Sequence, residues 1–461
     1  MATLVMADVL ALATATASVQ FGQNLAFDAN WLACNSEQAG VLLLLAGVYL
    51  ALSAFQGAYA PFPLQPAAEL RRIFGCALCA GLVVIAAQLL NGPISTVDLA
   101  AIGATTVLAA LFVPVQRAAC RMLFGRSRWW GVRVILVGSG GASAKAMQHL
   151  LRRPHGGLRP VGFVADGDPA AAAIDPEHYL GGPDALPEIA ARYRVGTAVV
   201  STTSFDAEEL AALMLRPDTG IAHWIVLPPW GQFPTLWTQA AEVAGVAGLS
   251  VTNRLATCWA RTAKRSFDLA ITLALGLAAL PVFALLSVLV RLSSPGPVFY
   301  SQERIGLHGR RFRAWKFRSM LANADEVLAQ HLAENPDLMA EWQATHKLKR
   351  DPRVTWIGYW LRKTSLDELP QVWNVLCGEM SLVGPRPIVE AEIDKYADCY
   401  AEYARVLPGI TGLWQINGRN NTTYDERVDF DAYYVRNWSP WLDLYILGCT
   451  VKVVLLREGA Y

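Results

Sequence analysis

Apolar residues fill the first quarter of the chain in four long runs, at about 2–19, 41–59, 74–91 and 99–116. Each run approaches the roughly 20 apolar residues that a helix needs to cross a bilayer. No basic residue precedes the first run and no clear cleavage site follows it, so we do not interpret it as a removed signal peptide. We therefore predict a four-helix transmembrane bundle over residues 1–125.

Basic residues gather on one side of this predicted bundle. The arginines that follow the second and the fourth runs are Arg71, Arg72, Arg117, Arg121, Arg126 and Arg128, and the other two connections carry no Lys or Arg. The positive-inside rule then places both ends of the bundle in the cytoplasm. Asp8 lies within the first run. An acid there is either a functional intramembrane group or a partner in helix packing.

From about residue 130 the pattern changes to alternating strands and helices. Strand-like runs occur at 132–137, 161–165, 197–201 and 223–227, and a helical stretch at 142–151 follows the first of them. This alternation predicts an α/β Rossmann-like domain over residues 126–255. The loop Gly138-Ser139-Gly140-Gly141 is an imperfect dinucleotide fingerprint, because Ser143 occupies the third glycine position. We therefore favour a structural or regulatory role for this domain over nucleotide binding.

Composition narrows the class of protein. The chain has 461 residues, of which 54% are hydrophobic, and a formal net charge of +1. This is too apolar for an ordinary soluble protein and too near neutrality for nucleic acid to be the main partner. Cys76 and Cys79 form a C-x-x-C inside an apolar run, and the histidines show no metal spacing. We interpret the cysteines as small residues of a membrane helix rather than as a zinc or redox pair.

A further apolar run, at about 269–290, opens the last part of the chain and is interrupted by Pro281. Lys264 and Arg265 precede the run and Arg291 follows it, which favours a cytoplasmic location for both of its ends. A proline in a helix interior removes a hydrogen bond and clashes with the preceding turn. We predict a re-entrant membrane helix that breaks at Pro281, with a fifth membrane span as the alternative.

The C-terminal run Trp441–Leu456 is also apolar but contains Asp443 and Lys452. Because of these charges, we expect an interfacial or packed helix rather than a membrane span.

Two adjacent acids, Asp367 and Glu368, stand in a segment whose nearest charges are otherwise basic. Adjacent carboxylates repel each other unless a positive charge neutralises them, and hard divalent cations take oxygen ligands. Carboxylates, cations and fixed arginines together suit phosphoryl transfer. The alternative is an exposed Asp-Glu pair that opens a helix after a Thr or Ser cap.

Two further blocks carry candidate binding residues. The first runs from Ser293 to Gly306 and continues to Lys316-Phe317-Arg318, where glycines allow close approach and the basic residues can hold anionic oxygens. The second, from Pro408 to Asn420, is rich in turns and carries amides and one arginine. It is suited to contacting the edge of a nucleotide or a sugar.

The three blocks, in this order, resemble the catalytic domain of the bacterial polyprenyl-phosphate phosphoglycosyl transferases. The likeness runs from about Lys264 to Tyr461, and the N-terminal half makes the chain similar to the long form of that family. The insert at about 340–349 is similar to that of the undecaprenyl-phosphate galactose phosphotransferases. The resemblance implies that residues 256–461 form a monotopic α/β catalytic domain with the re-entrant membrane helix.

The resemblance also implies an activity. The enzyme would transfer a sugar-1-phosphate, with galactose as the expected sugar, from a UDP-sugar to undecaprenyl phosphate and release UMP. This would be the first membrane step of O-antigen, capsule or exopolysaccharide synthesis, at the cytoplasmic face of the bacterial inner membrane. Asp367 would attack the sugar-bearing phosphorus, and Mg²⁺ held by Asp367 and Glu368 would neutralise the diphosphate. A homodimer is compatible with this reading.

Other residues receive supporting roles by the same resemblance. Those expected to hold phosphate oxygens are Arg362, Lys316, Arg318 and Arg386. Those expected to contact the nucleotide are Gln415, Asn417 and Arg419. For each of them the alternative is a solvated surface side chain.

Two other classes of function compete with this one. A membrane-anchored nucleotide-sugar dehydratase or epimerase needs a Tyr-x-x-x-Lys, and Tyr359 and Lys363 have that spacing, but no second glycine fingerprint stands upstream of them. A non-enzymatic polysaccharide-export or scaffold protein gives no reason for an acidic pair among arginines. We therefore favour the transferase.

Overall fold

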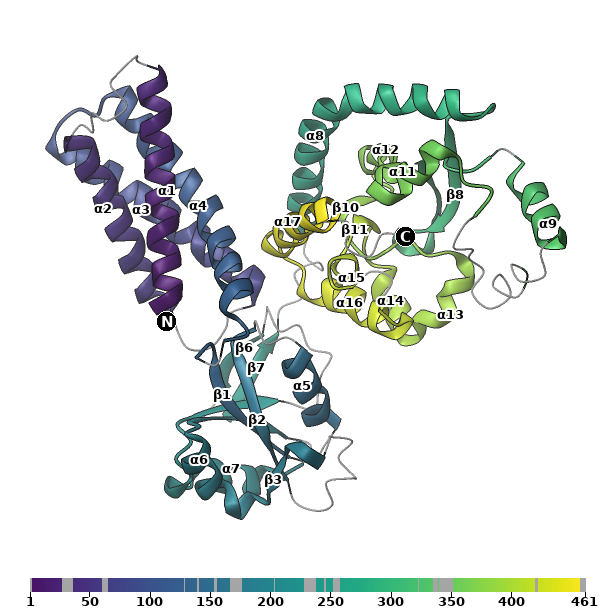
Figure 1. Cartoon of the computed structure of the whole chain (residues 1–461). Coiled ribbons are helices and arrows are strands. Elements are labelled where there is room, and N and C mark those ends of the chain that lie inside the picture. The colour runs from purple at the N-terminus through teal and green to yellow at the C-terminus, as the bar shows by residue number, and fades with distance from the viewer. Residues whose placement is uncertain are drawn as a thin grey trace. The chain divides into compact units, whose positions relative to one another are not determined.

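A computed structural model gives the fold of the chain (Figure 1). The residues that it describes are 2–26, 36–59, 65–127, 129–138, 141–152, 156–165, 176–202, 204–227, 238–243, 246–251, 258–321, 323–334, 339, 351–418 and 422–456. The chain divides into two compact units, Met1–Gln232 and Phe233–Tyr461. The first unit holds both the helical bundle and the parallel sheet, so the domain boundaries at 125 and 255 stay predictions.

All four predicted N-terminal runs are helices. They are α1 (Ala2–Ala26), α2 (Ser36–Phe55), α3 (Pro66–Asn91) and α4 (Thr96–Phe124). By length and composition, α1, α3 and α4 could each cross a membrane, as could one helix of the second unit. Helix α2, 20 residues long, contains the apolar stretch Gly40–Phe55 and ends before a turn at Gly57. Small side chains such as Ala11, Ala77 and Ala109 let the helices pack closely in the core of the bundle.

Two arginines that the sequence places after the fourth membrane run lie inside α4. Arg117 is 1% exposed and donates to both carboxylate oxygens of Asp8, at 2.7 and 2.6 Å, and to Glu69 at 2.9 Å. Arg121 donates twice to Glu69, and Tyr59 donates to Asp8. Counting Arg117 and Arg121 as loop charges was therefore wrong: the helix continues because both are neutralised within the bundle. Asp8 is a partner in helix packing.

The rest of the first unit is a five-stranded parallel sheet with helices. The strands are β1 (Val132–Val137), β2 (Leu158–Val164), β3 (Tyr179–Gly181), β4 (Thr197–Ser201) and β5 (His223–Leu227), and the helices are α5 (Gly141–Arg152), α6 (Leu186–Tyr193) and α7 (Ala207–Leu215). The strand order is β3-β2-β1-β4-β5. Gly138, directly after β1, has a φ of 115°, which favours glycine. A Cβ at this position would also lie 2.7 Å from Ser204 Oγ, so only glycine fits. The predicted α/β region is confirmed; β3 was not predicted.

The second unit carries the candidate site. Its main elements are β6 (Thr238–Val243), β7 (Val246–Val251), α8 (Cys258–Ser293), β8 (Phe299–Ile305), β9 (Arg311–Phe317), α9 (Ala324–Glu334), α11 (Trp356–Thr364), η9 (Leu366–Glu368), α12 (Gln371–Cys377), β10 (Ser381–Val383), α13 (Ile393–Tyr396), α14 (Tyr400–Tyr403), β11 (Gly409–Thr411), α15 (Leu413–Ile416), α16 (Tyr424–Asn437) and α17 (Pro440–Leu456). Strands β8 and β9 form an antiparallel hairpin, and β10 pairs with β11 in parallel.

Helix α8 is the fourth helix that is long and apolar enough to cross a membrane. Only 11% of its most apolar stretch is buried, so most of its apolar side chains face outward. Pro281 lies inside the helix, and Figure 1 shows α8 turning sharply along its length instead of running straight. The proline bends the helix without ending it, because a proline removes only one helical hydrogen bond and displaces the preceding turn.

A buried ion cluster ties the start of α8 to α17. Lys264 Nζ lies 3.1 Å from Asp268 and 2.8 Å from Asp443, and both carboxylates are buried. Asp443 also accepts from Tyr434 and Trp438. The predicted packed helix is thus confirmed for α17. Removing one member of such a cluster leaves an uncompensated buried charge, which costs about 3–5 kcal/mol.

Candidate active site

Asp367 and Glu368 lie in the short turn η9, between helices α11 and α12. Ser365, which joins α11 to this turn, has a left-handed φ of 58°, a conformation that costs a non-glycine residue about 1–3 kcal/mol. Ser365 makes no side-chain cap, and α12 begins only after Pro370. The alternative interpretation, two acids opening a capped helix, is therefore wrong. The turn holds both acids between two helices.

The β8–β9 hairpin brings a lysine to this acidic turn. Lys316, near the end of β9, places its Nζ 2.7 Å from Glu368 Oε1 and 3.9 Å from Asp367 Oδ2. The Lys316 side chain is 27% exposed and that of Asp367 14%. This ion pair is therefore only partly screened by water, and Lys316 can also reach an anion bound beside the carboxylates.

Arg362 faces the same turn from α11. Its Nε donates to Ser319 Oγ at 2.9 Å, which fixes the direction of the guanidinium. Burial lowers the pKa of Arg362, and the nearby Asp367 charge opposes that effect. The structure thus brings together four of the residues predicted for the site: Asp367, Glu368, Lys316 and Arg362.

The electrostatics distinguish the two acids of the turn. Burial raises the pKa of Asp367 to about 6, and the charge of Glu368 adds to that effect. Lys316 and Arg362 oppose it. A carboxylate with such a pKa is ionised at neutral pH but poorly hydrated, which suits a nucleophile.

Other predicted site residues make contacts elsewhere. Arg318 is 6% exposed and donates to the Ser294 and Pro295 carbonyls, so it ties the end of β9 to the turn after α8. The side-chain amides of Gln415 and Asn417 donate to backbone carbonyls of their own segment. Arg419 lies outside the described residues, as does the insert at 340–349.

A second group of cations was missed by sequence reasoning, apart from Arg386. The guanidinium carbons of Arg386 and Arg427 lie 5.3 and 4.7 Å from the centre of the Trp414 ring. Burial lowers the pKa of Arg304, and the charge of Arg386 lowers it further, whereas Glu392 and Glu368 raise it. The charge on Arg304 therefore interacts with both the second group of cations and the acidic turn. Stacked arginines keep their donor edges free for an anion.

Four buried polar atoms in and around this group have no hydrogen-bond partner among the described residues: Trp414 Nε1, Tyr424 OH, Arg427 Nε and Asp431 Oδ1. The other Asp431 oxygen accepts from Tyr396 OH at 2.7 Å. Burial raises the pKa of Asp431 to about 7. Buried polar groups are normally satisfied, so such a concentration is typical of a binding site. Trp414 stands in the third sequence block, but Arg427 and Asp431 lie on α16, outside every motif.

Comparison with known proteins decides the family. A family model described as bacterial sugar transferase matches residues 259–457, which include the whole acidic turn. The UDP-galactose-lipid carrier transferase of Erwinia amylovora is 39% identical over 371 residues, which cover 77% of this chain and 75% of that protein. This chain belongs to the bacterial sugar transferase family.

Two more relatives of this sugar transferase indicate how the likeness is distributed. The undecaprenyl-phosphate galactose phosphotransferase of Salmonella typhimurium is 38% identical over 361 residues, 77% of this chain and 74% of the relative. The exopolysaccharide production protein ExoY of Rhizobium meliloti is 52% identical over 200 residues, which are 43% of this chain but 88% of ExoY. Less than half of the chain thus matches nearly the whole of one relative.

The alternative dehydratase motif does not form a comparable site in this sugar transferase. Tyr359 and Lys363 lie on α11 with Nζ 3.3 Å from the hydroxyl, and Tyr359 is 53% exposed. Lys363 Nζ also lies 5.4 Å from the ring centres of Tyr359 and Trp360. Among the described residues of this unit, every sheet has two strands, so no dinucleotide-binding sheet adjoins the pair. We do not favour the alternative.

The raised pKa of Asp367 generates a pH prediction. In the enzyme free of metal and substrate, the Asp367 carboxyl should titrate with a midpoint near 6, read as the infrared carboxylate signal that Asp367→Asn removes. Lys316→Gln removes a charge that lowers this pKa, so the midpoint should move upward, whereas Lys316→Arg should keep it. A wild-type midpoint near 4, the ordinary value for aspartate, would contradict the assignment.

Proposed function

We propose that this transferase moves galactose-1-phosphate from UDP-galactose to undecaprenyl phosphate and releases UMP. The reaction would open the membrane stage of O-antigen, capsule or exopolysaccharide synthesis. The observation that carries the proposal is the partly buried Asp367 beside Glu368, faced by Lys316 and Arg362. Relatives whose names include galactose-lipid carrier transferase and galactose phosphotransferase support the choice of substrates.

The reaction proceeds in two displacements. A carboxylate oxygen of Asp367 attacks the sugar-bearing phosphorus, the bond to the UMP oxygen breaks, and an aspartyl-phosphosugar forms. A phosphate oxygen of undecaprenyl phosphate then attacks the same phosphorus, and the Asp367 carboxylate leaves. One difficult displacement is thereby divided into two, each with a good leaving group.

Cationic side chains hold the phosphates during both steps. Lys316 and Arg362 lie beside Asp367, and we assign them to the transferred phosphoryl group. Arg386 and Arg427 are held on Trp414, and we assign them to the UMP phosphate together with Arg304. Preorganised donors of this kind stabilise charge that develops in the transition state. Gln415, Asn417 and Arg419 keep their expected role at the nucleotide.

Asp367 and Glu368 are also the residues that would hold Mg²⁺. No group of three or more His, Cys, Asp or Glu that could bind a metal occurs in the described part of the chain. Mg²⁺ is commonly held by only one or two carboxylates plus substrate phosphates, so the adjacent pair fits the ion. When bound, the ion would neutralise the charge of the diphosphate.

The choice of galactose rests on the relatives. Two relatives named for galactose are 39% and 38% identical to this chain, whereas the UDP-glucose:undecaprenyl-phosphate glucose-1-phosphate transferase of Escherichia coli is 31% identical over a similar share. Glucose differs from galactose in the orientation of one hydroxyl group, so it is the competing donor.

We assign the sheet of the first unit to the Rossmann type and give it an accessory role. The strand order β3-β2-β1-β4-β5 is the order of that fold. Ser143, which replaces the third fingerprint glycine, is 1% exposed. Its side chain therefore occupies the position where a dinucleotide-binding loop has a glycine, which lets the helix pack closely on the strand. ExoY matches less than half of this chain, which supports an accessory role for the remainder.

The proposed reaction is tested by measuring UMP release from a panel of UDP-sugars with undecaprenyl phosphate present. UDP-galactose should give the highest kcat/KM, because the galactose relatives are the more similar. Asp367→Asn should lower turnover at least 1,000-fold, or about 4 kcal/mol of transition-state stabilisation, since the nucleophile is lost.

Two further observations complete that test. Asp367→Asn should still insert into membranes and elute as a folded protein, and chelation of divalent cations should stop the wild-type reaction. Substantial turnover by purified Asp367→Asn would contradict the mechanism. A preference for UDP-glucose would contradict the sugar assignment alone.

We also propose that α8 enters one leaflet of the inner membrane and returns, so that the catalytic unit sits on the cytoplasmic face. The bend of α8, its outward apolar side chains and the basic residues at both of its ends support this topology (Figure 1). UDP-sugars are cytoplasmic, so the acidic turn must face that side to meet them.

Cysteine labelling tests this topology. Thr262→Cys, near the start of α8, and Pro297→Cys, just after its end, are both at exposed positions and should react with a membrane-impermeant thiol reagent from the same, cytoplasmic side in a cysteine-free background. Reaction from opposite sides would mean that α8 is a full span.

A further inference from the structure

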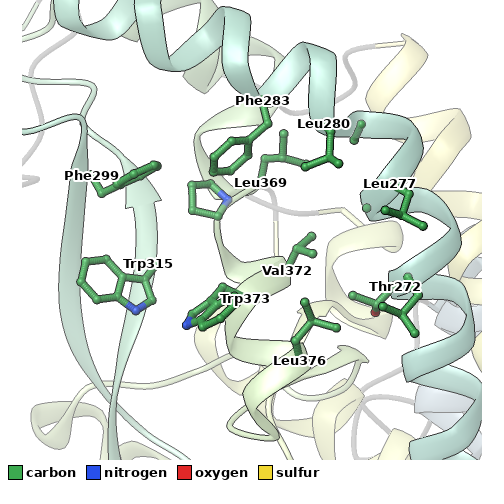
Figure 2. A pocket seen from close by; sticks show the side chains of 14 residues that line it. Thr272, Leu277, Leu280, Phe283, Phe299, Trp315, Leu369, Val372, Trp373 and Leu376 are labelled. Carbon is green, nitrogen blue, oxygen red and sulfur yellow. The ribbon is translucent and has the colours of Figure 1, made fainter.

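An apolar groove of about 560 Å³ lies beside the acidic turn (Figure 2). Side chains of α8, including Leu277, Leu280 and Phe283, face those of α12, including Val372 and Trp373, while Phe299 and Trp315 approach from the β8–β9 hairpin. The volume is in the range of sites that bind small molecules. The mechanism above uses none of these side chains.

The groove adjoins the candidate active site. Leu369 and Pro370, which directly follow Glu368, form part of its wall. Since consecutive Cα atoms are about 3.8 Å apart, the Leu369 Cα lies within about 8 Å of the Asp367 Cα. A ligand whose anionic group is attached directly to its apolar part can therefore lie in the groove and place that group near Asp367.

The groove is also continuous with the outer surface of α8. Leu277 and Leu280 line it and are 67% and 57% exposed, and neighbouring side chains such as Leu275 are exposed as well. Exposed apolar side chains of this density on a helix able to enter a bilayer face lipid. A chain that starts in the groove can thus continue into the bilayer.

We propose that the groove seats the isoprene units nearest the phosphate of the polyprenyl acceptor, an inference that rests on the proposed function. A polyprenyl phosphate has an anionic head joined directly to a branched apolar chain. The acyl chains of a phospholipid are instead separated from their phosphate by glycerol ester groups, which would bring polar atoms into an apolar groove. The remainder of the polyprenyl chain stays in the bilayer.

The groove then contributes alignment more than affinity. Moving an isoprenoid from bilayer to groove exchanges one apolar environment for another, so little hydrophobic free energy is gained. Fixing the first units of the chain does restrict where the phosphate can lie, and correct placement of reacting groups is worth orders of magnitude in rate. The second displacement should therefore depend on the groove, and the first should not.

Two adjacent positions of α8 offer a matched pair of variants. Ala279 lines the groove, whereas Ala278 is exposed outside it. Ala279→Phe fills the groove, and Ala278→Phe adds the same side chain to the outer surface. The first displacement is read without lipid, as exchange of labelled UMP into the UDP-sugar. The second is read as transfer to undecaprenyl phosphate.

We expect Ala279→Phe to keep UMP exchange within about twofold of wild type and to lose at least tenfold in the rate of transfer, with Ala278→Phe near wild type in both. Wild-type transfer by Ala279→Phe would overturn the proposal. A wild-type enzyme that shows neither exchange nor transfer would instead refute the proposed function.

A second measurement covers the case in which Ala279→Phe loses both activities through misfolding. A polyprenyl phosphate with a photoreactive group in its first isoprene unit should crosslink wild-type enzyme on α8 or α12 at groove residues. Undecaprenyl phosphate should compete, and phospholipid should not. Crosslinks outside the groove, or equal competition by phospholipid, would overturn the proposal.

Discussion

The central constraint on this molecule is a pair of carboxylates on adjacent, partly buried residues. Asp367 and Glu368 repel each other, and the partial burial of Asp367 weakens the screening of that repulsion by water. The surrounding elements supply the compensation: β9 brings Lys316 and α11 brings Arg362. A left-handed Ser365 stores strain where the chain passes from α11 into the turn. A site arranged in this way favours the binding of cations and of phosphate groups that carry bound cations.

The same turn stands at a boundary between polar and apolar surroundings. The charge on Arg304 couples the turn to Arg386, which is held on Trp414, while Leu369 and Pro370, directly after the turn, form part of the wall of the apolar groove. The buried cluster of Lys264, Asp268 and Asp443 anchors the start of α8 to the catalytic unit. This anchoring holds the first turns of α8 against α17. A water-soluble donor and a lipid acceptor can therefore meet at one carboxylate.

Local patterns predicted much of this arrangement. Strands β1, β4 and β5 have their predicted bounds, because each is a short apolar run with clear ends. The sequence predicted the acidic turn and Lys316 as site residues because each stands in a short motif together with basic residues. Arg427 and Asp431 were missed because they lie on a helix whose partners are distant in the chain. Arg117 and Arg318 were misplaced for the same reason: only the folded chain shows which carboxylate or carbonyl takes an arginine.

The central claim is that Asp367 becomes covalently attached to the sugar phosphate. Mass spectrometry of the enzyme after incubation with UDP-galactose, without lipid acceptor, tests it most directly. The account predicts a mass increase of one hexose phosphate on the peptide that contains Asp367, absent in Asp367→Asn and removed by undecaprenyl phosphate. An active enzyme that carries no adduct under rapid quenching, or carries it on another residue, would contradict the account.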